Sequence, residues 1–262
     1  MYDYHMHSKF SPDGANSLEE MIKSAIEKNA KEICITDHVE LSSPYGDEIF
    51  DIGDYKETIS DLRKKYPELT IKSGAELGLQ LDNLDRLNDF VERGNFDFVL
   101  GSVHSAEGFG IHEKAFVGSR NWDEVVTAYF ENLYGCIKIY KNYDVVGHLD
   151  VIKRYHEPLR DFSFDRHYEI VDAILKLIIQ DGKGIEINTG GLRYSYCNDI
   201  NPTRDLLERY KKLGGEIITF GSDSHNINDI LHGYSDVKKL LLELGYCNIA
   251  TFENRKVRFV AL

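Results

Sequence analysis

The sequence lacks paired cysteines, long apolar runs and a signal-like N-terminus. Its four cysteines lie far apart without a Cys-x-x-Cys pair, which argues against a disulfide framework and is typical of reduced, buried thiols. No stretch approaches about 18 consecutive apolar residues, so no membrane span is predicted. The opening segment, Met-Tyr-Asp-Tyr-His-Met-His, lacks the basic and apolar regions of a signal peptide. We therefore expect a cytoplasmic protein without a membrane partner.

Basic residues are scarce as well, with 31 Lys and Arg against 44 Asp and Glu and a net charge of -13. Such an acidic chain is not expected to bind nucleic acid or anionic lipid through charge alone. Hydrophobic residues make up 42% of the 262 positions, which is enough for a large core. No linker rich in Pro, Gly or Ser divides the chain, so we expect a single domain over residues 1–262.

Short runs typical of β-strands alternate with longer segments of helical period along the whole chain. The predicted strands cover residues 2–5, 33–37, 71–76, 96–104, 144–148, 184–188 and 216–223. Ser17 and Glu20 form a capping box that opens the first helix, and Gly182 ends the helix that contains Val171 and Ile178. Further helices are predicted over residues 54–65, 82–93, 123–141, 203–213 and 229–244, and a terminal strand over 256–260 is a candidate to close an edge.

This alternation predicts an α/β protein with parallel strands and right-handed crossovers. Seven repeats in a chain of this length fit a (β/α) barrel slightly short of the eightfold form. Periodicity alone also allows a doubly wound open sheet.

Histidines and carboxylates fall at the ends of the predicted strands: His5, His7, Asp37, His38, Glu76, His104, His148, Asp150, Asp223 and His225. The carboxyl ends of parallel barrel strands open on one face, so these side chains are expected to converge there. In His5-Met6-His7, strand alternation points both rings to the same side. Imidazole and carboxylate donors suit zinc, manganese or iron, so the joint pattern predicts a metal site. Histidines outside the pattern are expected to be structural: His112, His156, His167 and His232.

In chain order the motifs read His-x-His, Ser-x-Asp-Gly, Thr-Asp-His, Gly-Ala-Glu, Gly-Ser-Val-His, Gly-His-Leu-Asp and Gly-Ser-Asp-Ser-His. This order resembles the polymerase and histidinol phosphatase (PHP) family from Asp3 to about Gly245. No polymerase region is attached. The tract Glu-Ile-Asn-Thr-Gly-Gly-Leu-Arg over residues 186–193, followed by Asn201-Pro202, is similar to the stand-alone histidinol-phosphatase branch.

The resemblance implies one PHP-type phosphoesterase domain, a distorted seven-stranded (β/α) TIM-like barrel that holds two or three divalent ions. The ligands that it implies for the first ion are His5, His7, Glu76 and Asp223. Glu76 would bridge to a second ion held by His104 and His148. The third ion would be bound by Asp13, His38 and His225, although some family members place His where this chain has Asp13.

The resemblance also implies hydrolysis of a small phosphate monoester, with L-histidinol phosphate in histidine biosynthesis as the first hypothesis. Such esters hydrolyse very slowly in water, and a hydroxide bridging two close ions can supply much of the rate enhancement. Glu76 and Asp223 are the catalytic candidates, and either Asp223 or the third ion would assist the leaving alkoxide. Arg154 and Arg193 are candidates for phosphate contact, because a guanidinium fork matches two phosphate oxygens.

Two long loops, over residues 39–54 and 105–122, are expected to form the substrate walls. Two other functions stay open: a PHP phosphoesterase acting on a nucleotide, phosphotyrosine or oligonucleotide end, and a non-catalytic metal-binding module. The sequence leaves the physiological metal, the general acid and the oligomeric state open.

Overall fold

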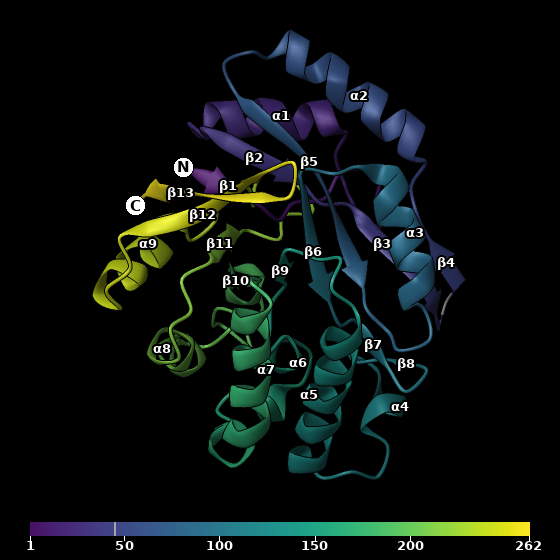
Figure 1. Ribbon diagram of the computed structural model, residues 1–262, viewed down its shortest axis with the longest axis vertical. Helices are drawn as coiled ribbons and strands as arrows, with labels where there is room; N and C mark the ends of the chain where they lie inside the picture. Colours follow the sequence, from purple (N-terminus) through teal and green to yellow (C-terminus); the bar gives the residue numbers. More distant parts are fainter. Residues whose placement is uncertain (45) are drawn as a thin grey trace.

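The computed structural model describes residues 1–44 and 46–262, and its centre is a nearly closed barrel (Figure 1). Seven strands run parallel in the order β1-β2-β5-β6-β9-β10-β11. They are β1 (Tyr2–Asp3), β2 (Glu32–Ile35), β5 (Thr70–Gly78), β6 (Phe98–Ser102), β9 (Val145–Val146), β10 (Gly184–Asn188) and β11 (Ile218–Gly221). The seven predicted strands are therefore confirmed, although most are shorter than predicted.

The first and last strands meet through backbone hydrogen bonds at and beyond their ends. The amide of Tyr4 donates to the carbonyl of Phe220, and the amide of Asp223 donates to the carbonyl of His5, both at 2.8 Å. A further parallel bridge joins Met6 to Ser224. This closure confirms the seven-stranded barrel over the open sheet, and it brings the first histidines beside Asp223.

Helices surround the barrel, and each predicted long helix is present (Figure 1). Their bounds are α1 (Leu18–Glu27), α2 (Ile52–Lys65), α3 (Leu84–Gly94), α4 (Lys114–Val117), α5 (Trp122–Ile139), α6 (Ile152–Tyr155), α7 (Tyr168–Gln180), α8 (Arg204–Lys212) and α9 (Tyr234–Glu243). The capping box is confirmed, since the Ser17 side chain accepts from the Glu20 amide and the Glu20 carboxylate accepts from the Ser17 amide. Gly182 follows α7 with a φ of 65°. Helix α9 starts five residues later than predicted because Leu231 and Gly233 before it adopt left-handed φ values of 59° and 72°.

The two segments predicted as plain loops contain secondary structure. Residues 39–54 contribute most of the hairpin β3 (His38–Ser43) and β4 (Gly46–Glu48), and β3 pairs in parallel with β5. Residues 105–122 form the hairpin β7 (Ser105–Ala106) and β8 (Phe109–Gly110), followed by α4. The loop assignment was wrong for residues 39–54 because β3 continues the pairing along β5, and for residues 105–122 because β7 pairs with β8. The expectation that both segments form the substrate walls stays a prediction; Tyr45 lies outside the described residues.

The terminal strand is β13 (Lys256–Ala261), which pairs antiparallel with β12 (Asn248–Glu253) and does not join the barrel sheet. This hairpin covers the amino-terminal end of the barrel. Phe252 packs there against Tyr4 and Phe98, with ring centroids 6.4 and 4.9 Å away. Strand β12 was not predicted because residues 249–252 are buried on both faces and show no alternation.

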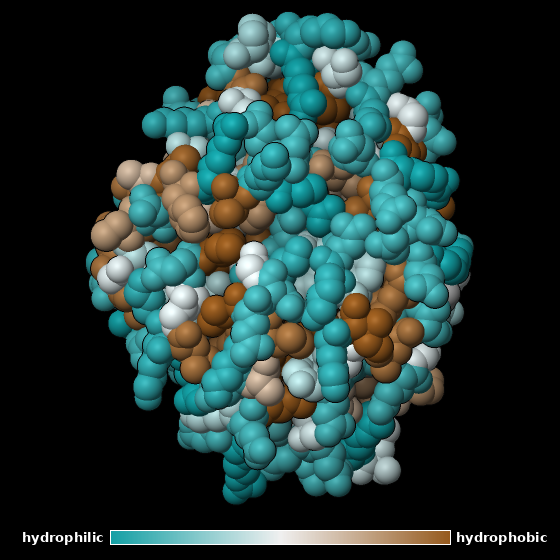
Figure 2. Space-filling view, viewed as in Figure 1, coloured by the Kyte–Doolittle hydropathy of each residue, from teal (hydrophilic) through white to brown (hydrophobic). Residues whose placement is uncertain are grey.

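The face shown in Figure 2 is mainly hydrophilic, with hydrophobic side chains in separate patches. No helix within residues 1–44 and 46–262 is both long enough and apolar enough to cross a membrane. Three of the four free cysteines are buried as expected, but Cys247 is exposed.

Candidate metal centre

The carboxyl ends of the barrel strands surround a cavity of about 270 Å³. It is lined by Asp13, His38, Glu40, Glu48, Glu76, His104, Ser105, His112, His148, Arg154, Tyr155, Tyr194, Asp223 and His225. Seven of the nine predicted ligand residues are in this lining, and His5 and His7 lie directly beneath, fully buried. The residues that the sequence placed at separate strand ends therefore converge.

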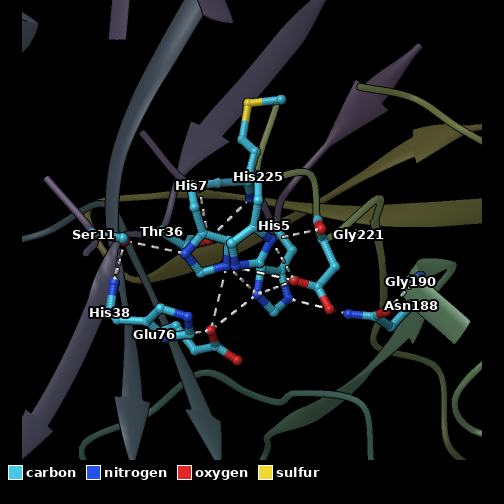
Figure 3. Close-up of polar contacts among 12 residues, drawn as sticks. His5, His7, Ser11, Thr36, His38, Glu76, Asn188, Gly190, Gly221 and His225 are labelled. Atoms are coloured by element: carbon cyan, nitrogen blue, oxygen red, sulfur yellow. Dashed lines mark hydrogen bonds and ion pairs between the residues drawn. The ribbon is translucent and has the colours of Figure 1, made fainter. Parts of the chain in front are cut away.

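The first donor group consists of His5, His7, Glu76 and Asp223. Figure 3 shows His5, His7 and Glu76 of this group. The Nε2 atom of His5 lies 3.0 Å from His7 Nε2, 3.1 Å from Glu76 Oε2 and 3.6 Å from Asp223 Oδ1. His7 Nε2 lies 3.5 Å from each of the same two carboxylate oxygens. Four donor atoms from three strands thus face one point.

The second group shares Glu76 through its other oxygen. Glu76 Oε1 lies 2.8 Å from His148 Nε2 and 3.3 Å from His104 Nε2, and the two ring nitrogens are 3.3 Å apart. Ser102 Oγ donates to the same oxygen at 2.8 Å. Glu76 is thus placed between two donor groups, as the resemblance implies for a bridging ligand.

The third group lies nearer the cavity mouth. Asp13 Oδ2 is 3.5 Å from His38 Nε2 and 3.1 Å from His225 Nε2. The rings of His38 and His225 both stack against the ring of His7, with centroids 4.2 and 4.1 Å from it. Asp13 is the most exposed of the predicted ligands, with 56% of its side chain accessible.

The donor spacing fits divalent ions. A tetrahedral ion with bonds of about 2.0–2.1 Å separates its donor atoms by about 3.4 Å, close to the separations in the first two groups. Without a cation the arrangement is poorly satisfied, because Glu76 Oε2 and His38 Nδ1 lie 3.1 Å apart yet neither has a hydrogen-bond partner among the described residues. The donors are imidazole and carboxylate without thiolate, a set that suits zinc, manganese or iron.

Two strand ends reach the site through a left-handed backbone. His148 has a φ of 21° and Asp223 has a φ of 53°, values that residues other than glycine rarely adopt. These turns explain why β9 and β11 end before the predicted ligands. Such strain is maintained only where the surroundings favour it, which is typical of functional sites.

Comparison with known proteins agrees with this geometry. Residues 3–190 match the family described as PHP domain. The chain belongs to the PHP domain family. It is 30% identical to a probable histidinol-phosphatase of Clostridium acetobutylicum, with 99% of each chain covered. It is also 30% identical to a histidinol-phosphatase of Lactococcus lactis subsp. lactis, over 97% of this chain and 95% of the relative.

A solved structure resembles this PHP domain along almost its whole length. The crystal structure of histidinol phosphate phosphatase from Lactococcus lactis, complexed with zinc, L-histidinol and phosphate, superposes with a TM-score of 0.86. The two chains are 29% identical, and 98% of each is covered. The barrel and its hairpins therefore belong to a fold already seen with metal bound.

Opposite charges inside the PHP site shift its titrating groups strongly. Burial lowers the pKa of His5, but the carboxylates of Glu186, Glu76 and Asp223 outweigh burial and hold that pKa well above its ordinary value. Conversely, burial raises the pKa of Glu76, but His5, His104 and His38 hold it well below. Before a metal binds, these shifts favour ionised carboxylates beside protonated rings.

The rings of His7 and His148 differ from the other ligand rings at the site. Burial and the neighbouring His225 and His38 rings hold the pKa of His7 well below its ordinary value. Burial also lowers the pKa of His148, although Glu76 acts in the opposite direction. A neutral imidazole can bind a metal without first losing a proton, so these lowered pKa values favour metal binding by the two rings.

The two candidate phosphate-binding arginines occupy different places. Arg154 lines the cavity, buried, with Nη1 2.5 Å from Asp223 Oδ2 and Nη2 2.7 Å from Asn188 Oδ1. Arg193 is not in the lining, and its two Nη atoms donate to the carbonyls of Ser222 and Asp223 at 2.7 and 2.6 Å. Arg154 is placed to reach a ligand in the cavity, whereas Arg193 holds the chain behind Asp223.

Several lining residues had no predicted role. Glu40 follows His38 by two positions on β3, and side chains two positions apart on a strand point to the same side. A strand prediction that started at His38 would therefore have placed Glu40 beside it. His112 was expected to be structural but lines the cavity, brought there by the β7–β8 hairpin and the turn after it. Glu48, Tyr155 and Tyr194 carried no motif signal.

Proposed function

We propose that this chain is a metal-dependent phosphomonoesterase that hydrolyses L-histidinol phosphate to L-histidinol and phosphate in histidine biosynthesis. The observation that carries the proposal is the convergence of eight ligand-type side chains around Glu76, at and directly beneath one cavity. The similarity to a histidinol phosphate phosphatase solved with zinc, L-histidinol and phosphate supports the same substrate.

Two or three divalent ions of zinc, manganese or iron would be held by the three donor groups. His5, His7, Glu76 and Asp223 would hold the first, Glu76, His104 and His148 the second, and Asp13, His38 and His225 the third. When bound, such ions lower the pKa of water and neutralise phosphate oxygens. The third set is the most exposed, which fits a more easily exchanged ion.

The chain's own residues would orient the ester and move the proton. Arg154 Nε is buried without a partner among the described residues, so this guanidinium can donate to a phosphate oxygen while its Nη atoms hold Asp223 and Asn188. Burial raises the pKa of Asp223, but His5 and Arg154 outweigh it and keep the carboxylate ionised. Either Asp223 or the third ion would assist the leaving alkoxide oxygen. Phosphate contact by Arg193 stays a prediction.

Steady-state kinetics over a panel of small phosphate esters, with metal content measured on the same sample, tests the proposal. We expect L-histidinol phosphate to have a kcat/KM at least about tenfold above that of a generic aryl phosphate, since the cavity must select its leaving alcohol. A comparable or lower value would refute the substrate. Fewer than two metal equivalents, without activation by added manganese or zinc, would refute catalysis. The expected cytoplasmic location and the single domain over residues 1–262 stay predictions.

A further inference from the structure

Two buried carboxylates at the metal centre, Glu186 and Glu40, have no place in the three donor groups. Each lies against the Nδ1 atom of a proposed ligand histidine whose Nε2 atom faces the donors. Glu186 Oε1 is 2.6 Å from His5 Nδ1, and Glu40 Oε1 is 2.5 Å from His104 Nδ1. The two pairs are thus built alike on different strands.

Glu186, on β10, contacts both of the first two donor groups. Its Oε1 meets the His5 ring, and its Oε2 accepts from the backbone amide of His148 at 2.8 Å. That amide belongs to the residue with the left-handed φ of 21°. One carboxylate therefore orients the ring of His5 and holds the strained backbone that carries His148.

Glu40, on β3, is 7% exposed and lies opposite Gly78 in the β3–β5 register. Its partner His104 has Nε2 3.3 Å from both Glu76 Oε1 and His148 Nε2. Because one ring nitrogen is held by Glu40, the other is directed at the second donor group.

A glycine makes room for each carboxylate. A Cβ atom on Gly78 would lie 1.8 Å from Glu40 Oε2, with only Glu40 atoms among its three nearest neighbours. A Cβ atom on Gly221 would lie 1.9 Å from Glu186 Oε1 and 2.5 Å from His5 Cβ. Neither glycine has a positive φ, so the missing side chain, and not backbone freedom, is what these positions require.

We propose that Glu186 and Glu40 are positioning residues that fix the rings of His5 and His104 for metal binding. The inference rests on the proposed metal-dependent function. A carboxylate on one imidazole nitrogen fixes the tautomer, makes the other nitrogen more basic and aims it at the ion. Two other ligand rings lack such a direct contact: His7 Nδ1 meets the Ser11 hydroxyl at 3.3 Å, and His148 Nδ1 has no hydrogen-bond partner among the described residues.

The test measures zinc affinity of the full chain, stripped with a chelator and titrated with zinc in competition with a fluorescent zinc indicator. Glu186→Gln and Glu40→Gln keep the side-chain size, and we expect each to weaken zinc binding by about 10–100-fold. Gly78→Ala displaces Glu40 while every carboxylate remains, so it should reproduce the loss of Glu40→Gln. Turnover of Glu40→Gln should be restored by excess zinc, which a general structural defect would not allow.

Asp144→Asn is the matched control, because Asp144 is a buried, hydrogen-bonded carboxylate at the opposite end of the barrel. Its zinc affinity should equal that of the unchanged protein. Unchanged zinc affinity in both glutamine variants, or an equal loss in Asp144→Asn, would overturn the inference. Absence of zinc binding by the unchanged protein would instead overturn the proposed function, and this inference with it. Gly78→Ala, Glu186→Gln and Glu40→Gln are three separate proteins. If one of them does not fold, the zinc affinities of the other two still test the inference.

Discussion

Buried carboxylates at the two ends of the barrel are neutralised in different ways. At the amino-terminal end, Asp144 pairs with Arg255 and accepts from the Val99 amide at 2.9 Å. Asp97 likewise pairs with Arg63 at 2.7 Å and accepts from an amide of the neighbouring strand. At the carboxyl-terminal end, Glu76 faces five histidine rings, and no Lys or Arg pairs with it within residues 1–44 and 46–262.

The two ends also differ in what covers them. The β12–β13 hairpin covers the amino-terminal end and completes an apolar cluster of Tyr4, Cys34, Phe98, Leu100, Val145, Ala250 and Phe252. The carboxyl-terminal end opens into the cavity with its polar lining. Apolar burial stabilises one end, whereas the other keeps charged groups accessible to a ligand.

The difference assigns separate tasks to the two ends. Burying a carboxylate costs free energy unless a cation and hydrogen bonds compensate it. The amino-terminal end supplies that cation from its own arginines, so its ion pairs are part of the fold. At the carboxyl-terminal end Arg154 pairs with Asp223, but Glu76 faces imidazoles in place of an arginine, so bound metal would complete its compensation. Folding and chemistry can therefore be altered separately.

Glu76→Ala should produce the largest effect on the carboxyl-terminal end. It removes the one carboxylate shared by the first two donor groups. Bound metal contributes several kcal/mol of transition-state stabilisation, so we expect kcat/KM to fall by more than about 10³-fold. Kinetics with L-histidinol phosphate and metal analysis of the same sample measure the loss, and circular dichroism should show the fold retained.

Asp97→Asn is the matched control at the amino-terminal end. It should lower the melting temperature while leaving kcat/KM unchanged, because the partners of Asp97 lie on α2, on β5 and in the terminal hairpin, away from the three donor groups. Retained activity in Glu76→Ala would refute a shared ligand. A similar loss of kcat/KM in folded Asp97→Asn would refute the division between the two ends.

Phe252→Ala should produce the next largest effect, on stability. Phe252 is 4% exposed and packs on Tyr4 and Phe98 inside the hairpin cluster. Truncation of a buried phenylalanine costs about 3–5 kcal/mol, so urea denaturation should show a loss of unfolding free energy of that size. Below the melting transition, kcat/KM should be unchanged; reduced turnover by the folded variant would show that the hairpin also shapes the catalytic end.

The donor residues were predictable because parallel strands bring their ends together whatever lies between them. Glu76 lies on β5, and His5 and His104 follow β1 and β6, three strands that the sequence pattern indicated. The strand bounds were not predictable to the residue, because the left-handed backbone of His148 and Asp223 depends on tertiary contacts.

The residues that the sequence did not reveal depend on packing between distant segments. Glu40 becomes interpretable only when β3 pairs with β5 and places it against His104. The location of β12 over the barrel depends on contacts with Tyr4 and Phe98, more than 150 positions away in the sequence. The local sequence pattern does not predict contacts between such distant segments, although it indicates which side chains lie at the strand ends.

The smallest effect that we predict is a pH dependence that separates the metal-free protein from the loaded one. In the metal-free protein, burial lowers the pKa of His38, but Glu76 and Asp13 outweigh it and raise the value to about 10, against 6.5 ordinarily. The pKa values of His5 and His104 are raised as well. Their contribution to stability is complete below pH 6.5 and is lost as the pH rises through the folded-state values.

Zinc reverses this dependence, because it binds neutral imidazole and its affinity increases as protons leave. Melting temperatures of chelated and zinc-loaded protein, measured from pH about 6 to about 9, should therefore diverge, with the chelated protein losing several degrees. The ion pairs of the amino-terminal end are the same in the chelated and the zinc-loaded protein, so a difference between the two melting curves reports the carboxyl-terminal end. Parallel curves for the two forms would mean that protons and metal do not compete for the same rings, which would remove the physical basis for separating the two ends.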